Sequence, residues 1–241
     1  MTSSSENNKI ILITGTSQGV GLGLAKSYLE RGWTVITAVR SPEKAPKLGG
    51  KSILVKIDTS SLTDFKDAVE ELKTKHNITH LDTVISNAGA NDSGSLLLEA
   101  DAEEFDWDYK VNTRGPLLLY QATRPLLKDD GTFAVLSSLA GSITRDFLWE
   151  KFGLYGASKA AVNYLVRTIH HEEPTLKAFT IHPGIVDTKM GREAGSNRGW
   201  DAAPPETIEG VVPGITKIID DATKEETSGW MWMNDGTKAL L

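Results

Sequence analysis

The apolar residues of this chain follow two patterns that alternate from one end to the other. Short runs of β-branched and other apolar residues, such as residues 9–14 and 34–39, are typical of strands buried on both faces of a parallel sheet. After the first run, Val20, Leu24 and Tyr28 recur at a spacing that predicts an amphipathic helix. The runs of the first kind predict strands at residues 9–14, 34–39, 52–57, 81–86, 131–137, 178–182 and 230–233.

Helical patterns fill most segments between these predicted strands. They predict a helix that stops at Gly32 and further helices at residues 64–76, 101–127 with an interruption near Gly115, 155–171 and 205–221. This alternation predicts an α/β fold, a single doubly wound Rossmann domain with a seven-stranded parallel sheet. We expect the domain to span residues 9–241, after a disordered polar tail at residues 1–8. Residues 186–205 form a long glycine-rich connection, which predicts a lid or binding loop.

Composition excludes several function classes for a chain of 241 residues. The absence of cysteine excludes a disulfide framework, a thiolate nucleophile and a cysteine-ligated zinc. Because His170, His171 and His182 have no third ligand at metal spacing, we interpret them as structural and predict no metal site. A net charge of −6 without a basic run argues against nucleic acid or an anionic membrane as the main partner. With no signal-peptide pattern and no membrane-spanning apolar run, the expected location is cytoplasmic.

A glycine-rich loop at residues 15–21 joins the first predicted strand to the first predicted helix. In this context small residues let the backbone approach a pyrophosphate, and the helix N-terminus offers free N–H groups. A glycine-rich turn without a ligand is the alternative interpretation. Because crossovers are right-handed, the strand ends lie along one edge of the sheet, where open α/β sheets bind ligands. That edge carries residues 15–21, Arg40, Asp58, residues 87–89, Ser138 and residues 183–184.

Arg40 follows the second predicted strand, where a bound dinucleotide would place its adenosine ribose. An acidic residue there suits the 2′-hydroxyl of NAD, whereas an arginine suits the 2′-phosphate of NADP. No Asp or Glu stands at this strand end, so the sequence favours NADP(H) over NAD(H). A solvated surface arginine is the alternative.

Tyr155 and Lys159 stand four residues apart, which places them on one face of a helix. An ammonium beside a phenol favours the phenolate, so we expect Lys159 to lower the pKa of Tyr155 and make it a proton donor and acceptor near neutral pH. An ordinary surface helix is the alternative. Asn112 is a polar residue in an apolar segment, and its amide either serves a site or caps local backbone.

Taken in order, these motifs resemble the short-chain dehydrogenase/reductase family over nearly the whole chain. The matching motifs are the T-G-x-x-x-G-x-G cofactor loop at residues 14–21, the N-A-G element at 87–89 and the P-G at 183–184. The residues that match the family's catalytic tetrad are Asn112, Ser138, Tyr155 and Lys159. The ending at residues 228–236 is most similar to compact members, the sniffer-type carbonyl reductases and the norsolorinic acid ketoreductases.

The resemblance implies hydride transfer between NADP(H) and a carbonyl or alcohol carbon of a small molecule. Tyr155 would give its proton to the carbonyl oxygen, and Lys159 would stabilise the phenolate and hold the nicotinamide ribose. Ser138 would donate a hydrogen bond to the same oxygen, and Asn112 would hold a water that relays protons to Lys159. The residues expected to bind the cofactor are Gly15, Ser17, Gln18, Gly19, Val20, Gly21, Arg40, Asp58, Asn87, Ala88, Gly89, Tyr155, Lys159, Pro183, Gly184, Ile185 and Thr188.

Two serines compete for the role of hydrogen-bond donor. Spacing favours Ser142, which lies 13 residues before Tyr155, closer to the family's usual interval than Ser138, which lies 17 before it. The Ser-Ser-x-Ala-Gly context at a strand end favours Ser138, because the loop at residues 143–152 can absorb extra residues at little cost. We therefore expect Ser138, and Ser142 remains the alternative.

The sequence says less about the substrate than about the cofactor. Phe147, Trp149, Phe152, Met190 and Trp200 could line a pocket for an apolar or aromatic carbonyl, polyketide-type metabolites included, or form a patch at a subunit interface. The resemblance also implies a homodimer or homotetramer. The expected function is NADPH-dependent reduction of a ketone or aldehyde. The alternatives are a dehydratase, imine reductase or cyclase on the same scaffold, and a non-catalytic NADP-sensing protein.

Overall fold

The computed structural model describes residues 9–91, 94–146 and 148–240. The predicted disordered tail at residues 1–8 and the aromatic residue Phe147 lie outside the described residues. In the described part of the chain, no helix is long and apolar enough to cross a membrane.

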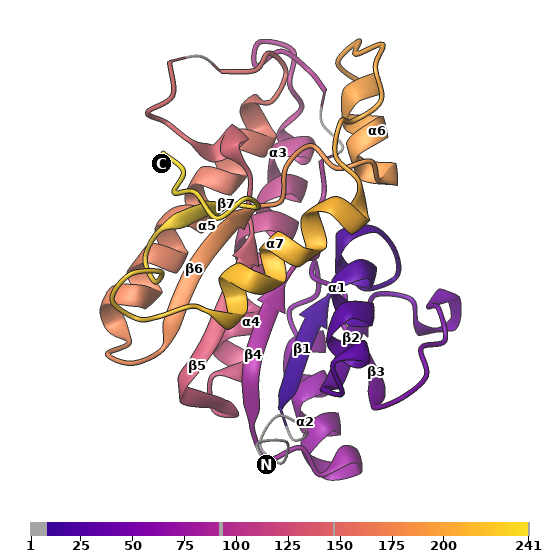
Figure 1. The fold of residues 1–241 in the computed structure, drawn as a ribbon. Helices are drawn as coiled ribbons and strands as arrows, with labels where there is room; N and C mark the ends of the chain where they lie inside the picture. The colour runs from indigo at the N-terminus through magenta and orange to yellow at the C-terminus, as the bar shows by residue number, and fades with distance from the viewer. Residues whose placement is uncertain (1–8, 92–93, 147, 241) are drawn as a thin grey trace.

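The predicted seven-stranded parallel sheet is confirmed, with strand order β3-β2-β1-β4-β5-β6-β7 (Figure 1). The strands are β1 (Ile10–Thr14), β2 (Thr34–Val39), β3 (Ser52–Lys56), β4 (Leu81–Ser86), β5 (Leu127–Leu136), β6 (Lys177–His182) and β7 (Met231–Met233). The order reverses between β1 and β4, which is the switch point at which α/β sheets of this kind bind ligands.

Helices cover both faces of this sheet. They are α1 (Gly19–Glu30), α2 (Asp64–His76), α3 (Ala102–Tyr109), α4 (Gly115–Thr123), α5 (Gly153–Glu172), α6 (Lys189–Ser196) and α7 (Ile208–Asp220). One core cluster joins the sheet to α2, α4 and α5, and a second joins it to α1 and α7, which crosses in front of the sheet in Figure 1. Strand β1 shows why its sequence is continuously apolar, since Leu12 packs in the first cluster while Ile11 and Ile13 pack in the second.

The predicted helix at residues 101–127 is wrong in its extent. The interruption predicted near Gly115 is a π-helical turn (Lys110–Arg114) that separates α3 from α4, but α4 ends at Thr123 and β5 begins at Leu127 rather than at residue 131. The register between β4 and β5 shifts between Leu81 and Thr83, and residues 128–130 at that point are exposed. These exposed residues interrupt the apolar run, so the sequence pattern detects only the second half of β5.

The glycine-rich connection at residues 186–205 contains a helix that the sequence pattern missed. Helix α6 begins after Thr188, whose hydroxyl accepts a hydrogen bond from the Gly191 N–H at 3.1 Å. Only Ala194 and Gly195 of this short helix are buried, and Gly191 and Gly195 lie within it, so the segment has the composition of a loop. The last long helix likewise begins at Ile208 rather than at residue 205, after the capping residue Thr207. In Figure 1, α6 stands beyond the carboxyl ends of the strands.

Candidate active site

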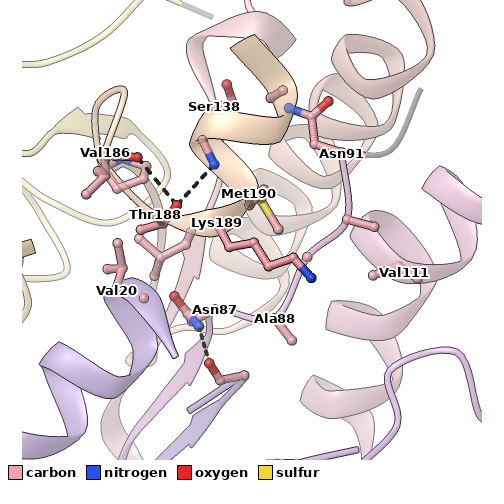
Figure 2. A pocket seen from close by; sticks show the side chains of 18 of the residues that line it. Val20, Asn87, Ala88, Asn91, Val111, Ser138, Val186, Thr188, Lys189 and Met190 are labelled. Atoms are coloured by element: carbon pink, nitrogen blue, oxygen red, sulfur yellow. Dashed lines mark hydrogen bonds between the residues drawn. The ribbon is translucent and has the colours of Figure 1, made fainter. Parts of the chain in front are cut away.

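A cavity of about 450 Å³ opens at the carboxyl ends of the strands, below α6. Figure 2 shows Val20 and Asn87 along one part of its wall and Thr188, Lys189 and Met190 along another. The predicted site residues that line it are Gly15, Ser17, Gln18, Gly19, Val20, Arg40, Asp58, Asn87, Ala88, Gly89, Ser138, Tyr155, Lys159, Pro183, Gly184, Ile185 and Thr188. The structure thus brings together every predicted site residue at one cavity except Gly21 and Asn112, which are not among its lining residues.

The glycine loop is built by close backbone packing. Gly15 has a φ of +72°, and a Cβ there would lie 2.9 Å from the Cα of Ala88. A Cβ on Gly21 would lie 2.3 Å from Asn87 Nδ2 and 2.5 Å from the Gly15 oxygen. Asn87 Nδ2 donates to the backbone oxygens of Thr14 and Gly15 at 2.9 and 3.2 Å. Asn87 therefore fixes the loop as well as lining the cavity, and only glycine fits at positions 15 and 21.

Arg40 and Asp58 line the cavity directly after β2 and shortly after β3. Arg40 is exposed directly after β2, where its guanidinium is accessible to an anion. The Asp58 carboxylate accepts hydrogen bonds from the Ser60 N–H and hydroxyl at 2.9 and 2.8 Å. The Asp58 N–H in turn donates to Asp64 at 3.0 Å. These bonds hold the turn after β3 in one conformation beside the cavity.

Asn112 is fully buried in the π-helical turn, and its amide bonds to the backbone of Ala90, 22 residues away, rather than to local backbone. Its Oδ1 accepts from the Ala90 N–H, and its Nδ2 donates to the Ala90 oxygen, both at 2.9 Å. Nδ2 also donates to Ser158 Oγ at 3.0 Å. Asn112 thus joins the segment after β4 to α5, and its water-holding role stays a prediction.

Ser138, Tyr155 and Lys159 line the same cavity, and all three are buried. The side chains of Ser138 and Tyr155 are hydrogen-bonded. Lys159 Nζ donates to the Leu136 oxygen at 3.0 Å and lies 5.6 Å from the centroid of the Tyr155 ring. Two hydroxyls and an ammonium therefore face the same small volume.

Burial changes the proton affinities of this pair in a way that the sequence pattern did not predict. The pKa of Tyr155 is raised to about 12, mainly because burial disfavours the phenolate, although the Ser138 hydrogen bond opposes this shift. The expected lowering of the Tyr155 pKa is thus wrong in direction for the protein alone. Burial also lowers the pKa of Lys159 to about 8, and the negative charge of Asp108 opposes that shift. At neutral pH, Tyr155 holds its proton and can donate it.

The two candidate serines differ in their position relative to the cavity. Ser138 lines the cavity and bonds to Tyr155, whereas Ser142 is not among the lining residues. Ser142 Oγ is buried and has no hydrogen-bond partner among the described residues. This geometry favours Ser138 as the group that faces a substrate oxygen.

We predict that Ser138→Ala lowers kcat/KM for carbonyl reduction by about 10²-fold, because it removes a donor to the developing oxyanion. Ser142→Ala is the matched control, and it should keep activity within about threefold of the wild type since Ser142 does not line the cavity. Steady-state kinetics of both variants with NADPH measures the difference. The opposite ranking of the two variants would assign the role to Ser142.

Aromatic side chains line the part of the cavity beyond Tyr155. Of the predicted set, Trp149, Phe152, Met190 and Trp200 line the cavity. The ring centroid of Phe152 lies 5.7 Å from that of Trp149 and 6.0 Å from those of Tyr155 and Trp200. Trp107, from α3, also lines it and was missed, because only the fold brings α3 to this edge.

His182 is a second lining residue that the sequence interpretation left as structural. Its Nδ1 lies 3.3 Å from the Leu139 N–H and accepts a hydrogen bond from it. Burial lowers the pKa of His182 to about 4, and the positive charge of Arg145 adds to the shift. The neutral ring therefore carries its proton on Nε2, next to the serine loop.

Comparison with known proteins identifies the class. A model of the short chain dehydrogenase family matches residues 9–199, and the chain belongs to this family. It is 39% identical over 245 residues to the short-chain dehydrogenase RED3 of Pyricularia oryzae, covering 94% of this chain and 96% of that one. It is also 39% identical over 247 residues to the norsolorinic acid ketoreductase nor1 of Dothistroma septosporum, covering 94% and 90%.

Solved structures show the same fold. The NADPH-bound carbonyl reductase from chicken fatty liver has a TM-score of 0.85 at 23% identity, covering 97% of this chain and 94% of that one. The carbonyl reductase Sniffer of D. melanogaster has a TM-score of 0.84 at 24% identity, covering 97% and 99%. The chain is therefore an oxidoreductase of the short-chain dehydrogenase family whose relatives include ketoreductases.

Proposed function

We propose that this protein uses NADPH to reduce an apolar or aromatic ketone or aldehyde to the alcohol, with Tyr155 as the proton donor. The observation that carries the proposal is the hydrogen-bonded pair of Ser138 and Tyr155 beside Lys159. The glycine loop and the aromatic residues Trp149, Phe152 and Trp200 line the same cavity as this group. A hydride donor and a carbonyl could therefore meet at one point.

The residues present fit NADP(H). The glycine loop leaves bare backbone at the N-terminus of α1, where N–H groups are free to bind a pyrophosphate. A Cβ on Gly89 would lie 3.6 Å from Lys159 Nζ, so the absence of a side chain keeps the path to Lys159 open. Arg40 supplies a cation for a 2′-phosphate. When bound, the reduced nicotinamide supplies the hydride.

The chain's own groups would handle the proton and the developing charge. Ser138 and Tyr155 would both donate hydrogen bonds to the carbonyl oxygen, which polarises the carbonyl and positions it. As negative charge grows on that oxygen, Tyr155 releases its proton to it. Lys159 then stabilises the phenolate by its charge, and the aromatic residues exclude water from the apolar part of the substrate.

The experiment is a screen of NADPH consumption over aromatic ketones, quinones and small aldehydes, with the products identified. The proposal expects consumption that depends on the carbonyl and yields the corresponding alcohol. Binding of NADPH without turnover over the whole panel would favour the sensing alternative, and conversion of substrate without NADPH would favour a dehydratase or cyclase. Three norsolorinic acid ketoreductases among the relatives support testing ketones first.

We predict that Arg40→Ala weakens NADPH binding by about 10- to 100-fold and leaves NADH binding unchanged. The lost interaction is a charge-assisted hydrogen bond to the 2′-phosphate, which NADH lacks. Lys44→Ala is the matched control, since Lys44 is an exposed cation in the same loop that does not line the cavity. Calorimetric titration with both cofactors measures the ratio, and a wild-type preference for NADH would contradict the assignment.

A further inference from the structure

Arg198, two residues beyond α6, joins three segments that are distant in the sequence. Its guanidinium donates hydrogen bonds to Asn91 Oδ1 at 2.8 Å, to the Lys151 oxygen at 3.1 Å and to the Ala194 oxygen at 2.8 Å. Asn91 follows β4, Lys151 lies just before α5, and Ala194 belongs to α6. One half-buried side chain thus ties the end of α6 to the segment after β4 and to the segment before α5.

The same guanidinium stacks on the aromatic wall. Its carbon lies 3.6 Å from the centroid of the Phe152 ring. The Phe152 ring in turn contacts the rings of Tyr155 and Trp200, each at 6.0 Å between centroids. A planar guanidinium suits such a stack better than an ammonium does. Arg198 and Tyr155 thus both contact the Phe152 ring and restrict its position.

Backbone features around Arg198 show that the three segments meet closely. Lys151 has a φ of +59°, a left-handed conformation that is unfavourable for a residue with a Cβ, and its carbonyl is the one that Arg198 holds. A Cβ on Gly94 would lie 3.1 Å from the Cβ of Asn197, next to Arg198. The segment after β4 therefore packs against the end of α6 at two points.

We propose that Arg198 is a positioning residue that latches α6 over the cavity and fixes Phe152, so that the site selects planar aromatic carbonyls over small aliphatic ones. This inference rests on the proposed carbonyl reduction. A planar substrate needs the Phe152 and Trp200 rings in fixed positions to stack on them, whereas a small aldehyde needs only Ser138, Tyr155 and Lys159. Arg198 does not line the cavity itself, so its effect passes through the residues that it holds.

The test compares Arg198→Met with Arg192→Met. Arg192 is the matched control because it lies on α6, is exposed and pairs with Asp187 outside the cavity. With 2-acetylnaphthalene and butanal as substrates, Arg198→Met should lower kcat/KM about 30-fold for the aromatic ketone and less than about threefold for the aldehyde, with the Kd for NADPH unchanged. An equal loss for both substrates, or no loss for either, would overturn the proposal.

Arg198→Lys distinguishes the effect of the guanidinium stacked on Phe152 from the effect of the positive charge alone. Lysine keeps a cation but lacks the planar fork that reaches Asn91, Lys151 and Phe152 together, so the substrate-dependent loss should persist. Wild-type selectivity in Arg198→Lys would show that charge alone matters and would overturn the latch.

Hydrogen exchange tests the latch without turnover. Amides at residues 189–199 and 149–152 should exchange at least about fivefold faster in Arg198→Met than in Arg192→Met, because the two segments lose their common anchor. If the wild type reduced no carbonyl, the proposed function would fail while this measurement still decided the latch. Unchanged exchange in both segments would overturn the role proposed for Arg198 and would leave the proposed carbonyl reduction untouched.

Discussion

Tyr155→Phe should lower kcat for carbonyl reduction by about 10³-fold or more, because general-acid catalysis of this kind contributes about 10²- to 10⁴-fold and the same hydroxyl also binds the substrate oxygen. Phenylalanine keeps the ring contact with Phe152 and removes only the O–H that is bonded to Ser138. The fold and the cofactor affinity should therefore be retained. Single-turnover kinetics with saturating NADPH isolates the chemical step.

Tyr164→Phe is the control for this variant. Tyr164 lies on the same helix, α5, and its side chain is 74% exposed, so removing its hydroxyl should change neither kcat nor KM. Turnover of every carbonyl substrate at the wild-type rate by Tyr155→Phe would reject Tyr155 as the proton donor. A loss of NADPH binding in that variant would instead point to a structural role.

The strands of the sheet and the location of the site could be predicted from the sequence for a physical reason. Strands such as β1 are buried on both faces, so nearly every residue is apolar and the run stands out. Once the strands alternate with helices, right-handed crossovers put their carboxyl ends on one edge. Residues as distant as Gly15, Ser138 and Tyr155 then have to meet there, as the lining of the cavity shows.

Helix α6 and Arg198 could not be predicted from a local pattern in the sequence. Helix α6 is mostly exposed, so its polar residues and glycines looked like a loop. Arg198 is 107 residues from Asn91 and 47 from Lys151, and nothing in a local pattern pairs them. These side chains matter through tertiary contacts, which hydrophobic periodicity does not encode.

For Tyr155 and Lys159, the sequence likewise predicted what depends on local spacing and missed what depends on tertiary packing. The spacing of Tyr155 and Lys159 correctly placed both on one helix face, since Nζ lies 5.6 Å from the ring centroid. Spacing gives no burial, however, and burial is the largest influence on both groups. The result is a tyrosine that keeps its proton and a lysine that loses its proton more easily than usual.

Lys159→Met should lower kcat/KM for reduction by about 10³-fold at pH 7, because the phenolate left after proton transfer loses the charge beside it. The wild type should show the same loss as a function of pH. Since burial lowers the pKa of Lys159 to about 8 while that of Tyr155 is raised to about 12, both groups are protonated below pH 8. As pH rises through about 8, Lys159 becomes neutral and reduction should decline.

The decisive measurement is the pH profile of kcat/KM for wild type, Lys159→Met and Lys217→Met between pH 6 and 10. Lys217 is exposed on α7, so its variant should keep both the rate and the decline of the wild type. Lys159→Met should be slow and lack the decline near pH 8, because the group that titrates there is gone. A decline that persisted in Lys159→Met would belong to another group and would contradict the role given to Lys159, since removing a titrating residue must remove its limb from the profile.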